Sequence, residues 1–107
     1  MRKSGKSLRP PRLDDDFAAP LSFSVMSALQ GDAELEFGTL RRIVECEGSL
    51  LSGVIARLAH AGHLAVRDVS FGDAPGTWVR ATPRGTDAFS DHLAALREIV
   101  ERREAEV

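Results

Sequence analysis

Apolar residues recur with a helical period in three stretches of the first 62 residues. A first helix with Pro20 in its first turn is predicted from the stripe Leu21, Val25, Met26 and Leu29. After a loop over 35–37, a short second helix over 39–44 has the predicted buried side Leu40, Ile43 and Val44. A third helix, capped by Ser49 and ended by Gly62, is predicted from the stripe Leu51, Ile55, Leu58 and Ala61.

The hydrophobic period changes from about 3.6 residues to two after Gly62. The alternation of Leu64, Val66, Val69 and Phe71 predicts a strand, although the alternation is imperfect. A turn over 72–76 contains two glycines and a proline, and residues 77–81 form the predicted returning strand, with Trp78 packing at its base. Three helices followed by a hairpin describe a helix-turn-helix with a wing.

The last predicted element is a long helix from Pro83 to about Glu104, capped by Thr82. Some twenty helical residues span about 30 Å, which is more than so small a core can cover. We therefore expect the outer half of this helix to pair with a second copy of the chain. The predicted dimer interface is its apolar stripe, Phe89, Leu93, Leu96 and Val100.

These elements predict an α+β fold, mainly α: a winged helix-turn-helix over 14–107 with a long C-terminal dimerisation helix. Residues 1–13 are predicted to be a disordered arm with five cations and no acid, although the chain as a whole has a net charge of -2. Such an arm suits either contact with a DNA groove or backbone, or a solubilising tail.

Three segments resemble MarR/ArsR-like winged-helix regulators of bacteria, in the right order and spacing over roughly 14–100. LSGVIARLAHAGHL over 51–64 is similar to the recognition-helix signature of the group, and TWVRATPRG over 77–85 to its passage from the wing into the last helix. LEFGTL over 35–40 is similar to the start of the second helix. The resemblance implies a homodimeric transcriptional regulator that binds double-stranded DNA.

The resemblance also implies which residues contact DNA. The third helix would enter the major groove and the wing would reach the backbone or minor groove. The implied contacts are Ser49, Ser52, Gly53 and Arg57 on the helix, Arg67 and Arg80 on the wing, and Arg84 on phosphate. The sequence departs from the group at Gly53 and Val54, which cannot contact bases in bidentate fashion, and Glu45 and Glu47 bring repulsive charge near the helix.

Two alternatives stay open at this point. The outer face of the third helix would then consist of Leu50, Gly53, Val54 and Ala56. Such a face would suit a winged-helix module that no longer recognises specific DNA sequences and binds a protein partner instead. A small-molecule effector could instead gate the dimer from a pocket at its seam, although no residue pattern identifies the effector.

We expect neither an enzyme nor a cofactor, because the sequence offers no phosphate loop, no nucleophile with a base and no paired carboxylates in a concave setting. No metal site is predicted from His60, His63 and His92, and Cys46 is interpreted as a half-buried filler rather than a redox switch. One cysteine, no apolar run of about 20 residues and no secretory signal favour the cytoplasm and no membrane association.

Overall fold

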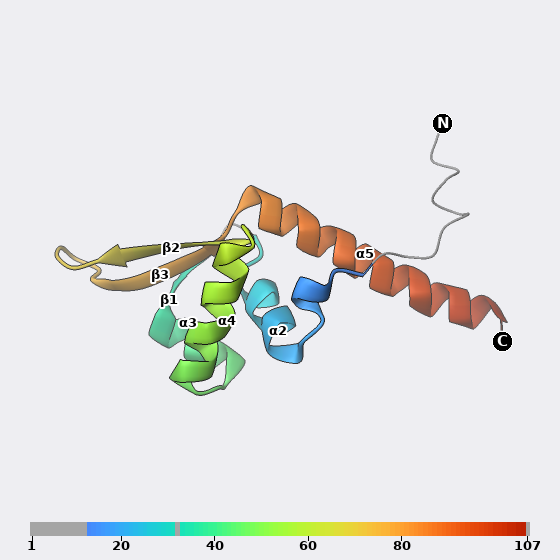
Figure 1. The fold of residues 1–107 in the computed structure, drawn as a ribbon, viewed down its shortest axis with the longest axis horizontal. Helices are drawn as coiled ribbons and strands as arrows, with labels where there is room; N and C mark the ends of the chain where they lie inside the picture. The colour runs from blue at the N-terminus through green and yellow to red at the C-terminus, as the bar shows by residue number, and fades with distance from the viewer. Residues whose placement is uncertain (1–12, 32, 107) are drawn as a thin grey trace.

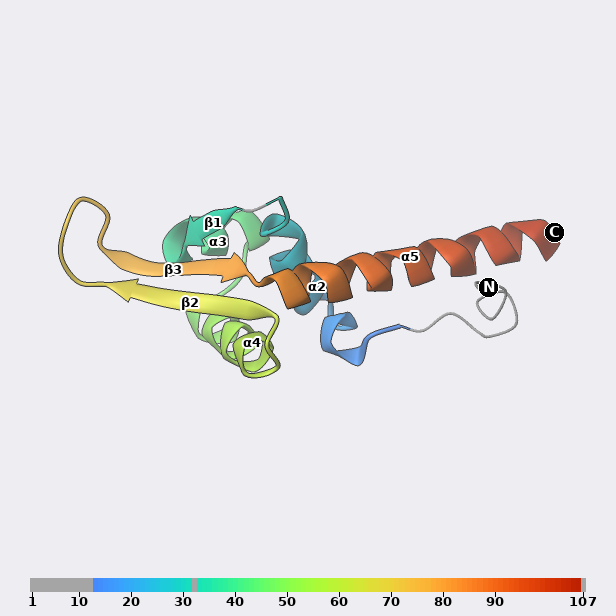
Figure 2. The ribbon, with the colours of Figure 1, turned by 90° about the horizontal axis from the view of Figure 1, so that it is seen from above.

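Three helices, a small sheet and one long helix make up the fold in a computed structural model that describes residues 13–31 and 33–106. The predicted arm lies outside the described residues apart from Leu13. The order of elements is η1 (Asp15–Phe17), α2 (Pro20–Ala28), β1 (Glu34–Glu36), α3 (Phe37–Val44), α4 (Gly48–His60), β2 (Leu64–Val69), β3 (Gly76–Ala81) and α5 (Pro83–Glu106). The β2–β3 hairpin and the end of α5 extend from opposite sides of the helical body (Figures 1 and 2).

The sheet is antiparallel with strand order β1-β3-β2. Strand β1 overlaps the stretch 35–37 that was predicted as a loop, because three residues are too few to show an alternating period. It pairs with β3 through Leu35 opposite Val79 and Glu36 opposite Trp78. Strand β2 ends at Val69, so the predicted strand residue Phe71 lies in the turn of the hairpin and is 89% exposed.

One core joins all the helices to the inner face of the sheet. Its fully buried side chains come from η1, α2, α3, α4, β3 and α5, and include Phe17, Val25, Met26, Leu40, Leu51, Leu58, Val79 and Phe89. Two predictions at the edges of helical stripes are wrong. Ile43 is 53% exposed, because the buried side of α3 runs through Phe37, Leu40 and Val44. Val54 is only 8% exposed and belongs to the inner face of α4.

The junction of α4, β2 and α5 is held by backbone contacts and one hydroxyl. Gly62 follows α4 with a φ of +89°, a conformation that favours glycine. Thr82 Oγ1 accepts from the Gly85 N–H at 2.9 Å, which confirms the predicted cap of α5, and donates to the Gly62 carbonyl at 2.7 Å. A Cβ at Gly85 would collide with the carbonyl of His63, so α5 can approach β2 this closely only with glycine there.

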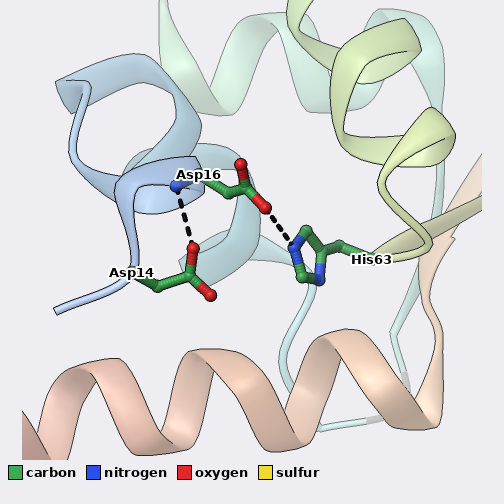
Figure 3. Close-up of side chains that lie close together, drawn as sticks. All are labelled: Asp14, Asp16 and His63. Carbon is green, nitrogen blue, oxygen red and sulfur yellow. Dashed lines mark hydrogen bonds and ion pairs between the residues drawn. The ribbon is translucent and has the colours of Figure 1, made fainter. Parts of the chain in front are cut away.

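The short helix η1 is fixed to the body by two buried histidines. The Asp14 N–H donates to His92 Nδ1 on α5 at 3.0 Å. Asp16 Oδ2 lies 2.9 Å from His63 Nε2, as Figure 3 shows. Phe17 fills the space between them, with its ring centroid 4.7 Å from that of His63 and 5.4 Å from that of Phe89. The chain therefore enters the fold beside α5, and not beside the wing (Figure 1).

Candidate nucleic-acid interface

The first half of the outer face of α4 is made mostly of small side chains. Helix α4 buries Leu51, Val54, Ile55 and Leu58, which leaves Ser49, Ser52, Gly53 and Ala56 exposed on the opposite side. The predicted N-cap, Ser49, lies instead in the first turn, since α4 begins one residue earlier, and its Oγ donates to Glu47 Oε1 at 3.4 Å. A Cβ at Gly53 would meet nothing within 4 Å. This face can approach another macromolecule closely but offers few hydrogen-bonding groups.

Arg57 is the one arginine on α4, and it reaches sideways to α2. Its Nη2 donates to Ser22 Oγ at 2.8 Å, although Arg57 as a whole is exposed. Ser22 is fully buried. The sequence analysis missed Ser22, although its position carried a signal: together with Val25, Met26 and Leu29 it falls on the apolar stripe of α2. A serine on a core stripe needs a hydrogen-bonding partner.

The turn between α3 and α4 mixes both signs of charge. Glu45 is the one non-glycine residue with a positive φ (53°) among the described residues, and both Glu45 and Glu47 are exposed. Two exposed cations that the sequence analysis did not select, Arg41 and Arg42, lie on the last turn of α3. Arg41 Nε donates to the Cys46 carbonyl at 3.2 Å, which holds the turn. Cys46 itself is half-buried, as predicted.

The two predicted wing arginines share one face of the sheet with glutamates. Arg80 on β3 lies directly opposite Glu34 on β1, and the alternation of side chains puts Arg67 of β2 on the same face. Arg67 pairs with both carboxylate oxygens of Glu34, at 2.7 and 3.2 Å. This bidentate hydrogen bonding lowers the pKa of Glu34 and raises that of Arg67. Arg67 is therefore engaged within the chain, and a DNA phosphate would have to compete with Glu34 for it.

Trp78 organises the wing from the same face. Its Nε1–H donates to the Ala74 carbonyl at 3.0 Å, and the Arg67 guanidinium lies 6.0 Å from its ring centroid. The ring therefore ties the turn of the hairpin to its strands.

A sequence profile of the winged helix DNA-binding domain matches residues 21–100, which run from α2 into α5 and include α4 and the whole wing. The chain belongs to this family. A search of curated protein sequences finds no match. Within the winged helix domain, α3 and α4 form the helix-turn-helix, and β2 and β3 form the wing.

Solved structures of transcriptional regulators have the same winged helix fold. One is the transcriptional regulator homologue from Pyrococcus horikoshii, with a TM-score of 0.75 and 20% identity over 80% of this chain and 85% of that one. Another is BpsR from Bordetella bronchiseptica, whose DNA binding is regulated by 6-hydroxynicotinic acid. Its TM-score is 0.68 and its sequence identity 21%, over 84% of this chain and 67% of that one. A third is a MarR-family regulator from Silicibacter pomeroyi, with a TM-score of 0.63 and 21% sequence identity over 79% of this chain and 56% of that one. The predicted winged helix fold is confirmed, and the present chain spans little more than half the length of the S. pomeroyi regulator.

Helix α5 of this winged helix domain carries the predicted dimer stripe, and one member of it needs correction. Phe89 is 1% exposed within a single chain, in contact with Phe17 and Phe23, so it has no surface left to offer a second copy. Leu93 and Val100 are 42% and 55% exposed, and Leu96 is partly buried. Arg84, in the first turn of α5, is exposed, and its guanidinium lies near Gly62 at the end of α4.

One group of side chains among the described residues could bring three metal ligands together. The carboxylate oxygens of Asp14 and Asp16 and a ring nitrogen of His63 lie within 4.8 Å of one another (Figure 3). Each already has a structural contact, because Asp14 caps η1 and Asp16 pairs with His63. A metal-ligating histidine normally donates its other N–H to a partner, whereas His63 Nδ1 is buried without one. We therefore assign this group to the docking of η1.

No helix within the described residues is long and apolar enough to cross a bilayer.

Proposed function

We propose that this winged helix protein is a DNA-binding transcriptional regulator that acts as a homodimer. The observation that carries the proposal is the outer face of α4, which lies opposite the core and is covered by no other described element. The family and the regulators of the same fold supply the context. In each protomer, α4 points toward a major groove and the wing toward the adjacent backbone.

The chemistry of α4 determines how DNA would be read. Ser49 and Ser52 can hydrogen-bond to a base edge or phosphate, whereas Gly53 and Ala56 offer no such group. Their small size lets the helix backbone sit deep in the groove. We infer that affinity comes mostly from phosphate contacts, and that sequence preference depends on backbone fit and on DNA shape.

Three exposed arginines supply the phosphate contacts in this proposal: Arg57 on α4, Arg80 on the wing and Arg84 on α5. Arg67 takes part only if DNA displaces it from Glu34. The five cations of residues 1–13 would add further positive charge. With about six phosphates neutralised by a dimer, affinity should fall about a thousandfold between roughly 50 and 200 mM salt.

The dimer would form through α5, on which Leu93 and Val100 are exposed and whose C-terminal part extends beyond the helical body (Figure 2). A two-fold pair of such helices would set the spacing between the two α4 helices, and so between DNA half-sites. BpsR is regulated by a small molecule, and gating of this dimer by an effector at the seam is an extension of the same proposal.

A second candidate function is protein binding through α4, favoured by the exposure of Leu50 beside Glu45 and Glu47. An apolar side chain flanked by acids suits a basic protein surface better than phosphate. Under this alternative, the chain would show no affinity for DNA even at low salt.

The experiment is a fluorescence anisotropy titration of the full chain with a labelled duplex from the region upstream of its own gene. An unlabelled unrelated duplex serves as competitor, and the titration is run at several salt concentrations. Light scattering on a sizing column gives the oligomeric state. We expect a dimer that binds with a steep inverse salt dependence. No binding at low salt would contradict the proposed function and favour protein recognition.

A further inference from the structure

The hydrogen bond between Ser22 and Arg57 links the interior of α2 to the outer side of α4. The two residues are 35 positions apart, and the Nη2–Oγ distance of 2.8 Å is that of a well-formed hydrogen bond. Ser22 is fully buried among the apolar residues of α2, so its hydroxyl is fixed by the core. Arg57 is therefore held at both ends, by its backbone on α4 and by its tip on α2.

One bond leaves most of the guanidinium available. Arginine has five N–H donors in a rigid plane, and the bond to Ser22 uses one of them. Arg57 is nevertheless exposed at the junction of α2 and α4, so the hydrogen bond to Ser22 does not remove it from the surface. An ordered, partly satisfied guanidinium at the surface is well suited to bind an anion that arrives from outside.

The position of Arg57 along α4 indicates which part of DNA it would meet. It lies in the last turn of α4. In helix-turn-helix proteins, base edges are contacted by residues near the start of the recognition helix. Arg57 lies at the other end of α4 and its guanidinium is turned toward α2, so it is positioned to contact the phosphate backbone rather than a base.

We infer that Ser22 is a positioning residue for DNA binding, which holds the Arg57 guanidinium ready for a backbone phosphate. This inference rests on the proposed function and adds the means by which α4 grips DNA. A free arginine loses side-chain entropy when DNA orders it, at a cost of roughly 0.5–1.5 kcal/mol, which corresponds to about a two- to tenfold change in affinity. Ser22 meets that cost during folding.

The test compares Ser22→Ala with Ser24→Ala, a control that removes a hydroxyl from an exposed position on the same helix. Both changes favour the helix slightly, so folding is retained. Ser22→Ala changes both protomers, so it should weaken binding by a dimer roughly fivefold to a hundredfold, on the upstream duplex and on an unrelated duplex alike. Its salt slope should stay that of wild type, because the charge is still present, whereas Arg57→Ala should lower the slope by about two phosphates per dimer, one from each protomer.

Two further measurements separate positioning from a merely structural role. In the Arg57→Ala background, Ser22→Ala should have no further effect on affinity. In the free protein, the NMR signal of the Arg57 Nε–H should show a rigid side chain in wild type and Ser24→Ala, and a mobile one in Ser22→Ala.

Equal or tighter DNA binding by Ser22→Ala would overturn the inference, since the serine would then be neutral or would withhold Arg57 from DNA. A loss of affinity that persists in the Arg57→Ala background would overturn it as well, because Ser22 would then act through the fold. In either case wild-type binding would leave the proposed function standing. No binding by wild type would remove the proposed function together with this inference.

Discussion

Replacing Thr82 by alanine tests the junction that fixes α5 to the end of α4. The Thr82 hydroxyl makes two hydrogen bonds, as the cap of α5 toward Gly85 and as a donor to the Gly62 carbonyl. Loss of a helix cap costs about 1 kcal/mol, and loss of a second hydrogen bond to a half-buried group costs about another 1 kcal/mol. We expect Thr82→Ala to reduce the free energy of unfolding by about 2 kcal/mol.

The matched control is Thr82→Ser, which removes the same methyl group but keeps the hydroxyl. The difference between the two variants therefore isolates the hydrogen bonds. Urea unfolding followed by circular dichroism, at one protein concentration because a dimer unfolds in a concentration-dependent way, measures that difference. A 2 kcal/mol gap corresponds to about 8–16 °C in melting temperature for a domain of this size. Variants that unfold within about 0.5 kcal/mol of each other would refute the reasoning.

Three further predictions concern the close approach of α5, the dimer stripe and the wing. Gly85→Ala should destabilise the fold by more than about 2 kcal/mol in urea unfolding, because its Cβ would collide with the His63 carbonyl. Gly53→Ala meets open space and should stabilise the fold by about 0.5–1 kcal/mol. Equal effects of the two substitutions would contradict the packing described. Leu93→Asp should yield a monomer on a light-scattering column while Ala94→Asp, an exposed position on another side of α5, stays dimeric; a dimeric Leu93→Asp would place the interface elsewhere. The Arg67 hydrogen bonds lower the Glu34 pKa, so the pair stabilises the fold above the ordinary carboxyl pKa of about 4.3, and this stabilisation is lost as pH falls through the lowered pKa. The small difference in unfolding free energy between wild type and Glu34→Gln should therefore shrink below about pH 4. A difference that grows there would contradict the pairing.

The spacing of apolar residues along the chain was sufficient to predict most of the fold. Helices α2, α4 and α5 have long stripes, and Pro20, Gly62 and Thr82 mark their ends by backbone chemistry that acts within a few residues. The errors arise where an element is too short to average its signal. Strand β1 has three residues, and Ile43 lies at the edge of a helix of eight.

The contacts that shape the candidate site join residues far apart in the sequence, and no local pattern encodes them. Arg67 was predicted as a free wing cation, but Glu34 lies 33 positions away and faces it only because β1 pairs with β3. Phe89 was assigned to the dimer stripe because helical period cannot show that η1 folds back against α5 and buries it. Ser22 was detectable as a polar residue on a core stripe, but its partner Arg57 was not.

The outer face of α4 is tested most directly by one charge placed in its centre. Gly53 has open space around it, so Gly53→Glu and Gly53→Gln should fold equally well and differ only in charge. If α4 enters the major groove, anisotropy titration at low salt should show strong loss of DNA binding by Gly53→Glu, while Gly53→Gln retains most of the wild-type affinity. Equal affinities of the two variants for DNA would contradict the account.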